Sequence, residues 1–328
     1  MTSFLTVGEA GLVSAAVCFT LIKLLLRTDV GSRISDIPNA RSLHTAPVPK
    51  IGGLGMVAGV AASCAIFGIS ILLPLAASAL AIVILSVCDD IWDLSVLLRF
   101  SIHTGAAFWV VWYYPSVWWL SLLAVVSTVW MSNLYNFMDG IDGLAGGMAV
   151  IGFTTYAIVA FDAHAADICI LSVAIASAGL AFLTFNLPPA LIFMGDAGSV
   201  PIGFLACTVG YVGYINLVWP MWFPVVVFSP FIVDATATLL IRFARGEKVW
   251  AAHRSHYYQR MALAGFGHAA TVRIWYALIV IVAAGALVAR VAPTGWRVAL
   301  LLLLCVTYLA AMYSVDRMSE HNEKAASR

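Results

Sequence analysis

The stretch SLLAVVSTVWMSNLYNFMDGIDGLAGGMAVIGFTTYAIVAF, residues 121–161, places a polar segment between two apolar ones. The apolar parts are Ser121–Met131 and Met148–Phe161. Between them, NLYNFMDGIDGLAGG (residues 133–147) holds two asparagines, two aspartates and four glycines. Polar groups at membrane depth are costly and usually mark a functional site. The stretch therefore predicts two apolar helices joined at a site.

The composition excludes an ordinary soluble domain, because 62% of the residues are hydrophobic and only 10% are charged. At about 20 apolar residues per span, the chain has room for roughly ten or eleven membrane helices. We expect one all-α, polytopic membrane domain over residues 1–328, with eleven spans, or ten if the short third helix does not cross. The expected helices are 4–26, 51–73, 75–88, 97–114, 117–135, 144–161, 167–185, 198–216, 219–241, 273–291 and 297–314.

The distribution of cations predicts the orientation of these spans. With the N-terminus outside the cell, every one of the 17 lysines and arginines except Arg290 and Arg297 falls on the inside. The C-terminus is then cytoplasmic. Five polar segments fall on the same inside face: 35–53, 89–99, 133–143, 185–199 and 242–260. We therefore expect one cytoplasmic site built from several loops.

Two acidic motifs are candidates for that site. In DDIWD, a continuing helix would bring Asp89, Asp90 and Asp93 to one face, where three like charges need a cation or cationic substrate group to offset them. In the opening stretch, Asn133, Asn136, Asp139 and Asp142 recur at every third residue and would line one wall of a helix. Asparagine amides suit sugar or nucleobase recognition, although a helix–helix contact explains Asn133 equally well.

The segment FMGDAGS places Asp196 between two glycines where a new helix begins. A carboxylate there suits Mg²⁺ bound with a diphosphate, because Mg²⁺ usually takes one or two carboxylates plus phosphate oxygens. A helix-capping aspartate explains the motif equally well.

The loop 242–273 contains HRSH, in which Arg254 lies between His253 and His256. Facing the acidic loops, it would act as a phosphate clamp. Arg242, Arg245 and Lys248 fit anchors at an anionic lipid surface instead.

Other polar residues are less decisive. Arg41 and Lys50, in the first inside loop, suit either a phosphate contact or a lipid anchor. His268 is interpreted as an ordinary loop residue. Asp234 is more suspicious, because it is ionisable within a span.

The segments DDIWDLSVLLR, NLYNFMDGIDGLAGG, FNLPPALIFMGDAGS and HRSHYYQR, together with the loop PNARSLHTAPVPKIGG, resemble in content and order the polyprenyl-phosphate N-acetylhexosamine-1-phosphate transferases. The resemblance spans residues 30–260. It implies an Mg²⁺-dependent transfer (Mn²⁺ being a substitute) of a sugar phosphate from a UDP-N-acetylhexosamine to undecaprenyl phosphate, with release of UMP. The enzyme would lie in a bacterial cytoplasmic membrane, with membrane lipid and no nucleic acid as a partner; a homodimer is left open.

The resemblance also implies roles. Asp89, Asp90, Asp139, Asp142, His253 and His256 match catalytic positions, Asp196 the metal position, and Lys50, Asn133, Asn136 and Arg254 substrate-binding positions. Lys50 stands where relatives often carry arginine, which puts a bidentate contact in doubt.

The HRSH pattern differs from the three adjacent histidines of the muramoyl-pentapeptide branch, and resembles the O-antigen-initiating branch that uses UDP-N-acetylglucosamine or a 6-deoxy relative. The alternative class is a secondary transporter using the carboxylates as ion sites, but its repeated halves are not visible in the sequence.

Overall fold

A computed structural model describes residues 3–28, 34–37, 47–69, 73–92, 94–251 and 253–326. The side chains of 90, 91 and 320–326 lie outside that description, as do Arg41 and Asp93. The elements in chain order are α1 (Phe4–Leu25), β1 (Ser35–Asp36), β2 (Val48–Pro49), α3 (Gly52–Phe67), α4 (Leu73–Trp92), α5 (Val96–Tyr113), α6 (Trp118–Phe137), α7 (Leu144–Asp162), α8 (Ala166–Asn186), α9 (Asp196–Ile215), α10 (Trp222–Val227), α11 (Ser229–Ala244), α12 (Tyr257–Met261), the π-helix η1 (Ala262–Phe266), α13 (Gly267–Val291) and α14 (Thr294–Ala326).

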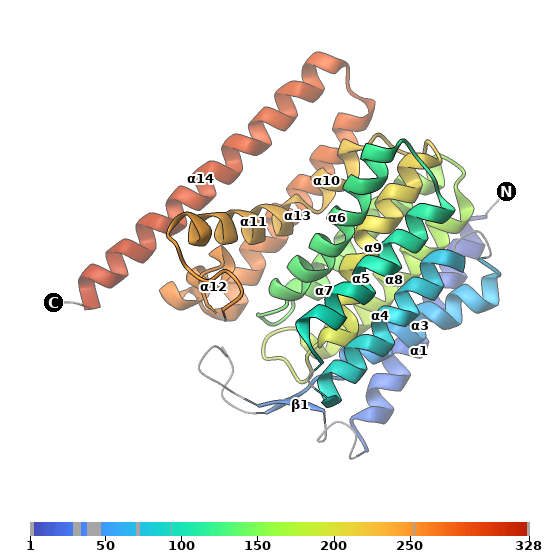
Figure 1. Cartoon of the computed structure of the whole chain (residues 1–328), viewed down its shortest axis with the longest axis horizontal. Coiled ribbons are helices and arrows are strands. Elements are labelled where there is room, and N and C mark those ends of the chain that lie inside the picture. Colours follow the sequence, from blue (N-terminus) through green and yellow to red (C-terminus); the bar gives the residue numbers. More distant parts are fainter. Residues whose placement is uncertain are drawn as a thin grey trace.

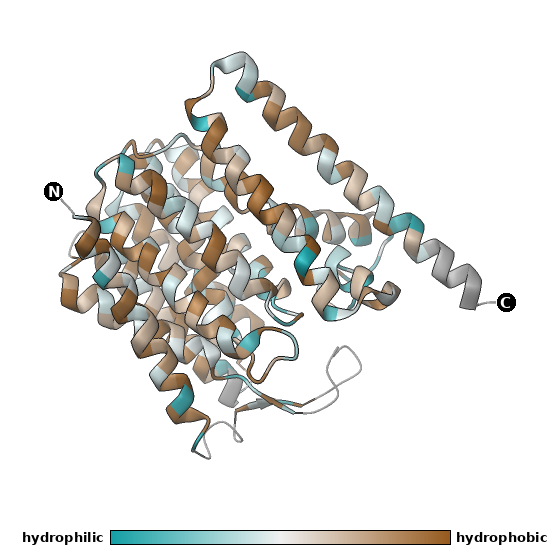
Figure 2. Ribbon diagram, turned by 180° about the vertical axis from the view of Figure 1, so that it is seen from behind, coloured by the Kyte–Doolittle hydropathy of each residue, from teal (hydrophilic) through white to brown (hydrophobic). Residues whose placement is uncertain are grey.

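The prediction of an all-α, polytopic membrane protein is confirmed. Helices α1 to α9 pack as a bundle, and α10 to α14 lie along one side of it (Figure 1). Apolar residues cover much of the helices along their length (Figure 2). Within the described residues, seven helices are long and apolar enough to cross a membrane. The count of eleven spans therefore stays a prediction.

Several helix boundaries differ from expectation. The expected helix 51–73 ends at Phe67 and is followed by Gly68 with a left-handed φ of 64°, and the expected helix 75–88 runs from Leu73 to Trp92. The expected helix 219–241 is broken at Phe228, and Pro230, which has no N–H to donate, lies in the first turn of the new helix α11. The expected loop 242–273 contains α12, η1 and the start of α13. The last helix, α14, extends well past residue 314 and leans away from the bundle (Figure 1).

Glycines allow the first helices of the bundle to approach closely. A Cβ on Gly53 would collide with the backbone of Gly198, and a Cβ on Gly198 would come within 2.6 Å of the Gly53 Cα. The N-termini of α3 and α9 therefore meet backbone to backbone, a packing that small residues permit in membrane helices. This contact brings Lys50, just before α3, next to Asp196, the first residue of α9.

The ends of the helices are gathered into two opposite faces. At one end, an ion pair joins Arg290, near the end of α13, to Asp162, at the end of α7. At the other, β1 pairs with β2, and hydrogen bonds connect the segment before α3 to the segment before α9, the residue before α7 to the end of α8, and α12 to the end of α6. The prediction that the polar loops lie together is confirmed, whereas the side of the membrane that they face stays a prediction.

Candidate active site

The α6–α7 turn carries the residues of the opening stretch. Helix α6 ends at Phe137 and α7 begins at Leu144, so Asp139 and Asp142 lie in the turn. The prediction of one helical wall is wrong for these two aspartates, while Asn133 and Asn136 do lie on α6. The physical reason is that α6 stops at Phe137, with Met138 as its C-cap, and the chain turns until Gly143, whose left-handed φ of 82° makes it the N-cap of α7.

Distant residues hold this turn in place; we call Asn186, Tyr258 and Tyr276 the turn anchors. The Tyr258 hydroxyl donates to the carbonyl of Phe137 (2.9 Å), and the Tyr276 hydroxyl donates to the carbonyl of Gly143 (2.6 Å). The Gly143 N–H donates to the side-chain oxygen of Asn186 (2.9 Å). The turn is therefore held in place by residues of α8, α12 and α13.

The loop between α8 and α9 is tied to the segment around Lys50. The Phe193 N–H donates to the Pro49 carbonyl, and the Gly53 N–H donates to the Met194 carbonyl, both at 2.8 Å. Gly195 has a left-handed φ of 71°, and a Cβ there would come within 3.1 Å of the Lys50 Cβ. These contacts place Lys50 beside the start of α9.

Asp196 is the first residue of α9, and the N-cap position belongs to Gly195. Among the described residues, no hydrogen bond or ion pair is made by the Asp196 side chain, so the capping interpretation of this motif is not supported. Its carboxylate remains available to a ligand at the start of a helix, where backbone N–H groups and the helix dipole favour anions.

The carboxylates of the turn and of α9 lie within electrostatic range of one another. Burial raises the pKa of Asp139 well above its ordinary value; the neighbouring Asp196 and Asp142 add to this rise, and Lys50 opposes it. The ammonium of Lys50 also lies 3.4 Å from Asp36 of β1. Asp139, Asp142 and Asp196 thus lie near one cation, Lys50, and the sequence predicted this grouping of the three aspartates. Asp36 is a fourth carboxylate in the same group.

These carboxylates fit a hard divalent cation. The side chains of Asp139 and Asp196 make no hydrogen bond or ion pair within the part of the chain that the structure describes, and the charge of Asp196 disfavours the ionised form of Asp139. No group of three or more possible metal-ligating side chains is preformed among those residues. A pair of carboxylates completed by phosphate oxygens and water is the donor set that Mg²⁺ commonly takes.

Asp142 differs from Asp139 because protein groups already satisfy it. Its Oδ2 accepts the N–H of Ala190 (3.1 Å) and lies 3.2 Å from the Nδ1 of His268. His268 is on α13 and not an ordinary loop residue, so that interpretation was wrong. Asp142 therefore joins the turn to the α8–α9 loop and to α13.

Asp89 lies at the end of α4, where it is bound to the next helix. Its carboxylate accepts the Arg99 guanidinium (2.6 Å) and the N–H of Leu94 (2.8 Å). His103 of α5 lies within electrostatic range of both Asp89 and Asp196, which puts the end of α4 near the other carboxylates. Asp90 is on the same helix, with a side chain outside the described set.

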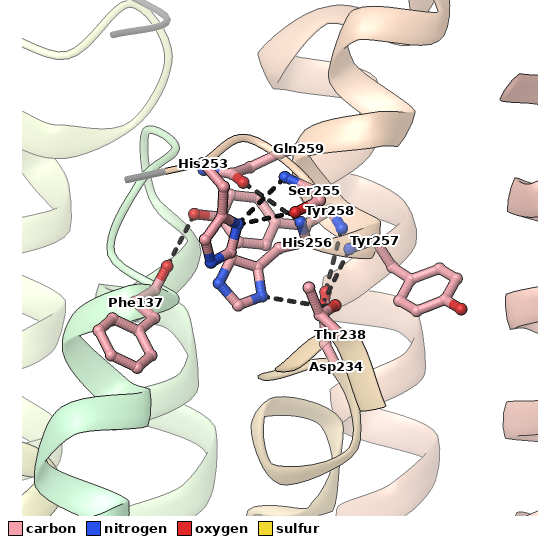
Figure 3. A network of polar contacts seen from close by, with 9 residues as sticks. All are labelled: Phe137, Asp234, Thr238, His253, Ser255, His256, Tyr257, Tyr258 and Gln259. Carbon is pink, nitrogen blue, oxygen red and sulfur yellow. Dashed lines mark hydrogen bonds and ion pairs between the residues drawn. The ribbon is translucent and has the colours of Figure 1, made fainter. Parts of the chain in front are cut away.

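The histidine motif lies beside the acidic turn (Figure 3). The rings of His253 and His256 are 4.9 Å apart, and that of His256 stacks at 6.2 Å on Phe137, the last residue of α6. The Nδ1 of His253 shares a hydrogen bond with the Ser255 hydroxyl (2.8 Å). Burial, assisted by the nearby His256 and Arg242, lowers the pKa of His253 to about 4. His253 is therefore neutral at neutral pH.

The cations of this loop have different roles. Arg242 is buried, and its guanidinium binds Glu247 (2.7 Å) and the Lys248 carbonyl (3.2 Å), so the prediction of a lipid anchor is wrong for this residue. Arg242 lies in the last turn of α11, and its acceptors lie in the turn that follows, which explains why its side chain is buried. Arg254 is exposed and makes no hydrogen bond or ion pair with the described residues, so it remains available to a ligand.

Sequence reasoning did not find the turn anchors. Asn186 had a visible signal, since it is a polar residue inside FNLPP at the end of an apolar run. Tyr258 and Tyr276 had none, because tyrosine is common at the ends of membrane helices. Arg99 was visible only as a positive charge on the inside face.

Comparisons with known proteins agree with this geometry. The family model of glycosyl transferase family 4 matches residues 72–214. A Bacillus subtilis protein named "Probable undecaprenyl-phosphate N-acetylglucosaminyl 1-phosphate transferase" is 28% identical over 339 residues, covering 95% of this chain and 94% of its own. The decaprenyl-phosphate N-acetylglucosaminephosphotransferase of Mycobacterium tuberculosis is 30% identical, covering 78% and 76%. The undecaprenyl-phosphate alpha-N-acetylglucosaminyl 1-phosphate transferase of Escherichia coli K12 is 28% identical, covering 81% and 78%.

A helical bundle with carboxylates converging at one end, together with these matches, defines a multi-pass membrane glycosyl transferase. The chain belongs to glycosyl transferase family 4, within its polyprenyl-phosphate N-acetylhexosamine-1-phosphate transferases.

Proposed function

We propose that the protein transfers N-acetylhexosamine-1-phosphate from a UDP-sugar to undecaprenyl phosphate on the cytoplasmic face of a bacterial inner membrane. An oxygen of the lipid phosphate attacks the sugar-bound phosphorus of the donor. A new phosphorus–oxygen bond forms, the bond between the two donor phosphates breaks, and UMP leaves. The product is a lipid-linked sugar that starts an envelope glycan such as O-antigen.

The observation that carries the proposal is that Asp139 and Asp196 lie near each other, and their side chains have no protein partner among the described residues. They lie beside Lys50 and the loop that carries His253 and His256, which we call the histidine loop. Joining two phosphates requires positive charge to offset their repulsion. Asp139 and Asp196 would hold Mg²⁺, which when bound neutralises charge on the diphosphate. Lys50 and the exposed Arg254 would contact phosphate oxygens directly.

The remaining site residues would orient the two substrates. Asp89 and Asp90, at the end of α4, would handle the lipid phosphate or its proton. Asn136, on the last turn of α6 and without a side-chain hydrogen bond to the described residues, would face the nucleotide or sugar. The side-chain nitrogen of Asn133 donates to the carbonyl of Val129 (2.7 Å), and its side-chain oxygen accepts no hydrogen bond from the described part of the chain.

An apolar cavity of about 80 Å³ supports a lipid acceptor. It lies between α11, α12, α13 and α14, and is lined by side chains such as Ile274, Leu278 and Met312. Asp234 and Tyr257, next to the histidine loop, also line it. A short part of an isoprenoid chain is apolar enough to fill such a space, with the phosphate directed to the loops.

The donor sugar is the finer part of the proposal. The three relatives named above, each matched over three quarters or more of its length, carry names that specify N-acetylglucosamine, and this chain has HRSH rather than three adjacent histidines. We therefore favour UDP-N-acetylglucosamine or a 6-deoxy relative over the muramoyl-pentapeptide nucleotide.

The test is UMP release by the purified protein with undecaprenyl phosphate and Mg²⁺, over a panel of UDP-sugars that includes the muramoyl donor. We expect release with UDP-N-acetylglucosamine that depends on the lipid and is abolished by EDTA and restored by Mg²⁺ or Mn²⁺. Arg254→Ala should lower turnover by roughly ten- to a thousandfold. UMP release with the muramoyl donor and with no other UDP-sugar would overturn the choice of sugar. If none of the UDP-sugars supports UMP release, the proposed activity is overturned.

A further inference from the structure

We infer that Asp234 is a positioning residue that orients His256, so that Nδ1 of the imidazole carries a proton and Nε2 is presented to the substrates. The role of Nε2 toward the substrates rests on the proposed transferase activity. The orientation of the imidazole by Asp234 does not depend on that activity. Asp234 lies on α11, at the level of the histidine loop, and is 3% exposed.

The Asp234 carboxylate organises the start of α12. It accepts the N–H groups of Tyr257 (2.9 Å) and Tyr258 (3.0 Å), and the hydroxyl of Thr238 lies 3.2 Å from its Oδ1. The first N–H groups of a helix have no partner within the helix, so a carboxylate from another helix is an effective cap. Asp234 thereby fixes the position of the residue just before α12, which is His256.

The same carboxylate faces the imidazole of His256 (Figure 3). Nδ1 of His256 is buried and lies 3.3 Å from Asp234 Oδ1, close enough for an ion pair although the geometry is not that of a hydrogen bond. An ionised carboxylate can only accept, so the nitrogen turned toward it carries the proton. Nε2 then keeps its lone pair when the ring is neutral, and becomes a donor when the ring is charged.

The neighbouring aromatic rings, His253 and the Arg242–Glu247 ion pair do not compete for this role. The ring of Phe137 from α6 stacks on it at 6.2 Å, and the ring of Tyr258 lies parallel at 5.9 Å. His253, 4.9 Å away between ring centres, directs its Nδ1 to Ser255. Arg242 and Glu247 form their own ion pair near His253. Asp234 is thus the carboxylate in contact with the imidazole among the described residues.

Tyr258 connects this arrangement to the acidic turn. Its N–H is held by Asp234, and its hydroxyl donates to Phe137 at the start of the turn that carries Asp139. A Cβ at Gly140 would collide with that hydroxyl, so the turn and α12 fit closely together. The position of His256 relative to Asp139 is therefore set through Asp234.

The experiment must separate orientation of the imidazole from simple capping of α12. Asp234→Asn keeps the size and one accepting oxygen, but its amide can also donate to Nδ1 and thereby favour the opposite tautomer. The matched control is Asp316→Asn, which removes the carboxylate that binds Arg260 of α12 from α14 (2.6 Å) without contacting His256. We expect Asp234→Asn to lower kcat for UMP release about tenfold or more with KM within about twofold, because a wrong tautomer impairs the chemical step. Asp316→Asn should keep kcat within about twofold.

A spectroscopic measurement tests the inference without activity. In protein labelled with ¹⁵N-histidine, with the His256 signals assigned through His256→Gln, the nitrogen shifts report which ring nitrogen is protonated. We expect a protonated Nδ1 in the wild type without substrate. An unprotonated Nδ1 in the wild type, or an unchanged kcat in folded Asp234→Asn, would overturn the inference. If the wild type releases no UMP from any donor, the proposed function fails, and the nitrogen shifts still decide the role of Asp234.

Discussion

Removing the Asn186 side chain should disconnect the two acidic loops of the site. Asn186 is 3% exposed; its oxygen accepts the Gly143 N–H (2.9 Å), and its nitrogen donates to the Ile192 carbonyl (2.8 Å). Asn186→Ala leaves both backbone groups buried without partners. Each unsatisfied group costs about 1–3 kcal/mol, so we expect the free energy of unfolding to fall by about 2–6 kcal/mol.

Two measurements check this expectation. At roughly 2 cal/mol/K of unfolding entropy per residue, this loss corresponds to a fall of roughly 3–9 °C in the thermal midpoint in detergent. UMP release, measured well below the midpoint, should fall further than the loss of folded protein explains, because Asp139 and Asp196 depend on the two loops that Asn186 joins. Asn186→Asp keeps an oxygen that accepts the Gly143 N–H, but its second oxygen would face the Ile192 carbonyl and repel it. This variant should therefore also lower the thermal midpoint and UMP release.

The matched control is Asn216→Ala. Asn216 follows α9 at the opposite end of the bundle, and its side chain donates to the Val212 carbonyl one turn earlier (2.8 Å). This local bond is worth about 1 kcal/mol, and its loss should leave UMP release unchanged. If Asn186→Ala and Asn216→Ala have equal midpoints and equal activity, the reasoning about the turn anchors is refuted.

Three other predictions follow from the site and the topology. Asp196→Asn should abolish UMP release and weaken Mn²⁺ binding, which paramagnetic broadening measures. If the variant binds Mn²⁺ with wild-type affinity, Asp196 has no metal role. Cysteines introduced at Ser116 and Thr294 should react with an impermeant reagent in intact spheroplasts, and reaction only after lysis would reverse the predicted orientation. The pKa of His253 is lowered from 6.5 to about 4, so the unfolded chain binds this proton first as the pH falls. The native state should thus lose stability from about pH 6.5 to pH 4, and His253→Gln should flatten that loss of thermal midpoint; an unchanged slope would contradict it.

The sequence predicted the helices because apolar runs of about 20 residues leave few alternatives in a membrane protein. Ranges such as 144–161 and 167–185 differ from α7 and α8 by a residue or so at each end. The break at Phe228 was missed because the residues around it, WFPVVVFSPFIV, are as apolar as those of an unbroken span. Hydropathy measures transfer to lipid and does not detect a local change of backbone direction.

The site was predicted in part. The polar residues in the inside loops identified Asp139, Asp142 and Asp196 as neighbours, because adjoining helix ends on one face must meet. Sequence periodicity could not tell that the Asp139 side chain has no hydrogen-bond or ion-pair partner among the described residues, while Asp142 is bound to His268 and Ala190. That difference depends on the positions of α8 and α13, which only the packed bundle fixes.

The origin of the turn anchors has a consequence for biogenesis. The turn at Gly143 is held by Tyr276, 133 residues later in the chain, and by Tyr258 before it. A nascent chain that has inserted everything up to α11 already contains Asp139 and Asp196, yet lacks two of the three groups that shape the turn between α6 and α7. Completion of the site is thereby coupled to the insertion of α12 and α13, so a chain arrested or truncated before them carries the acidic residues without their arrangement.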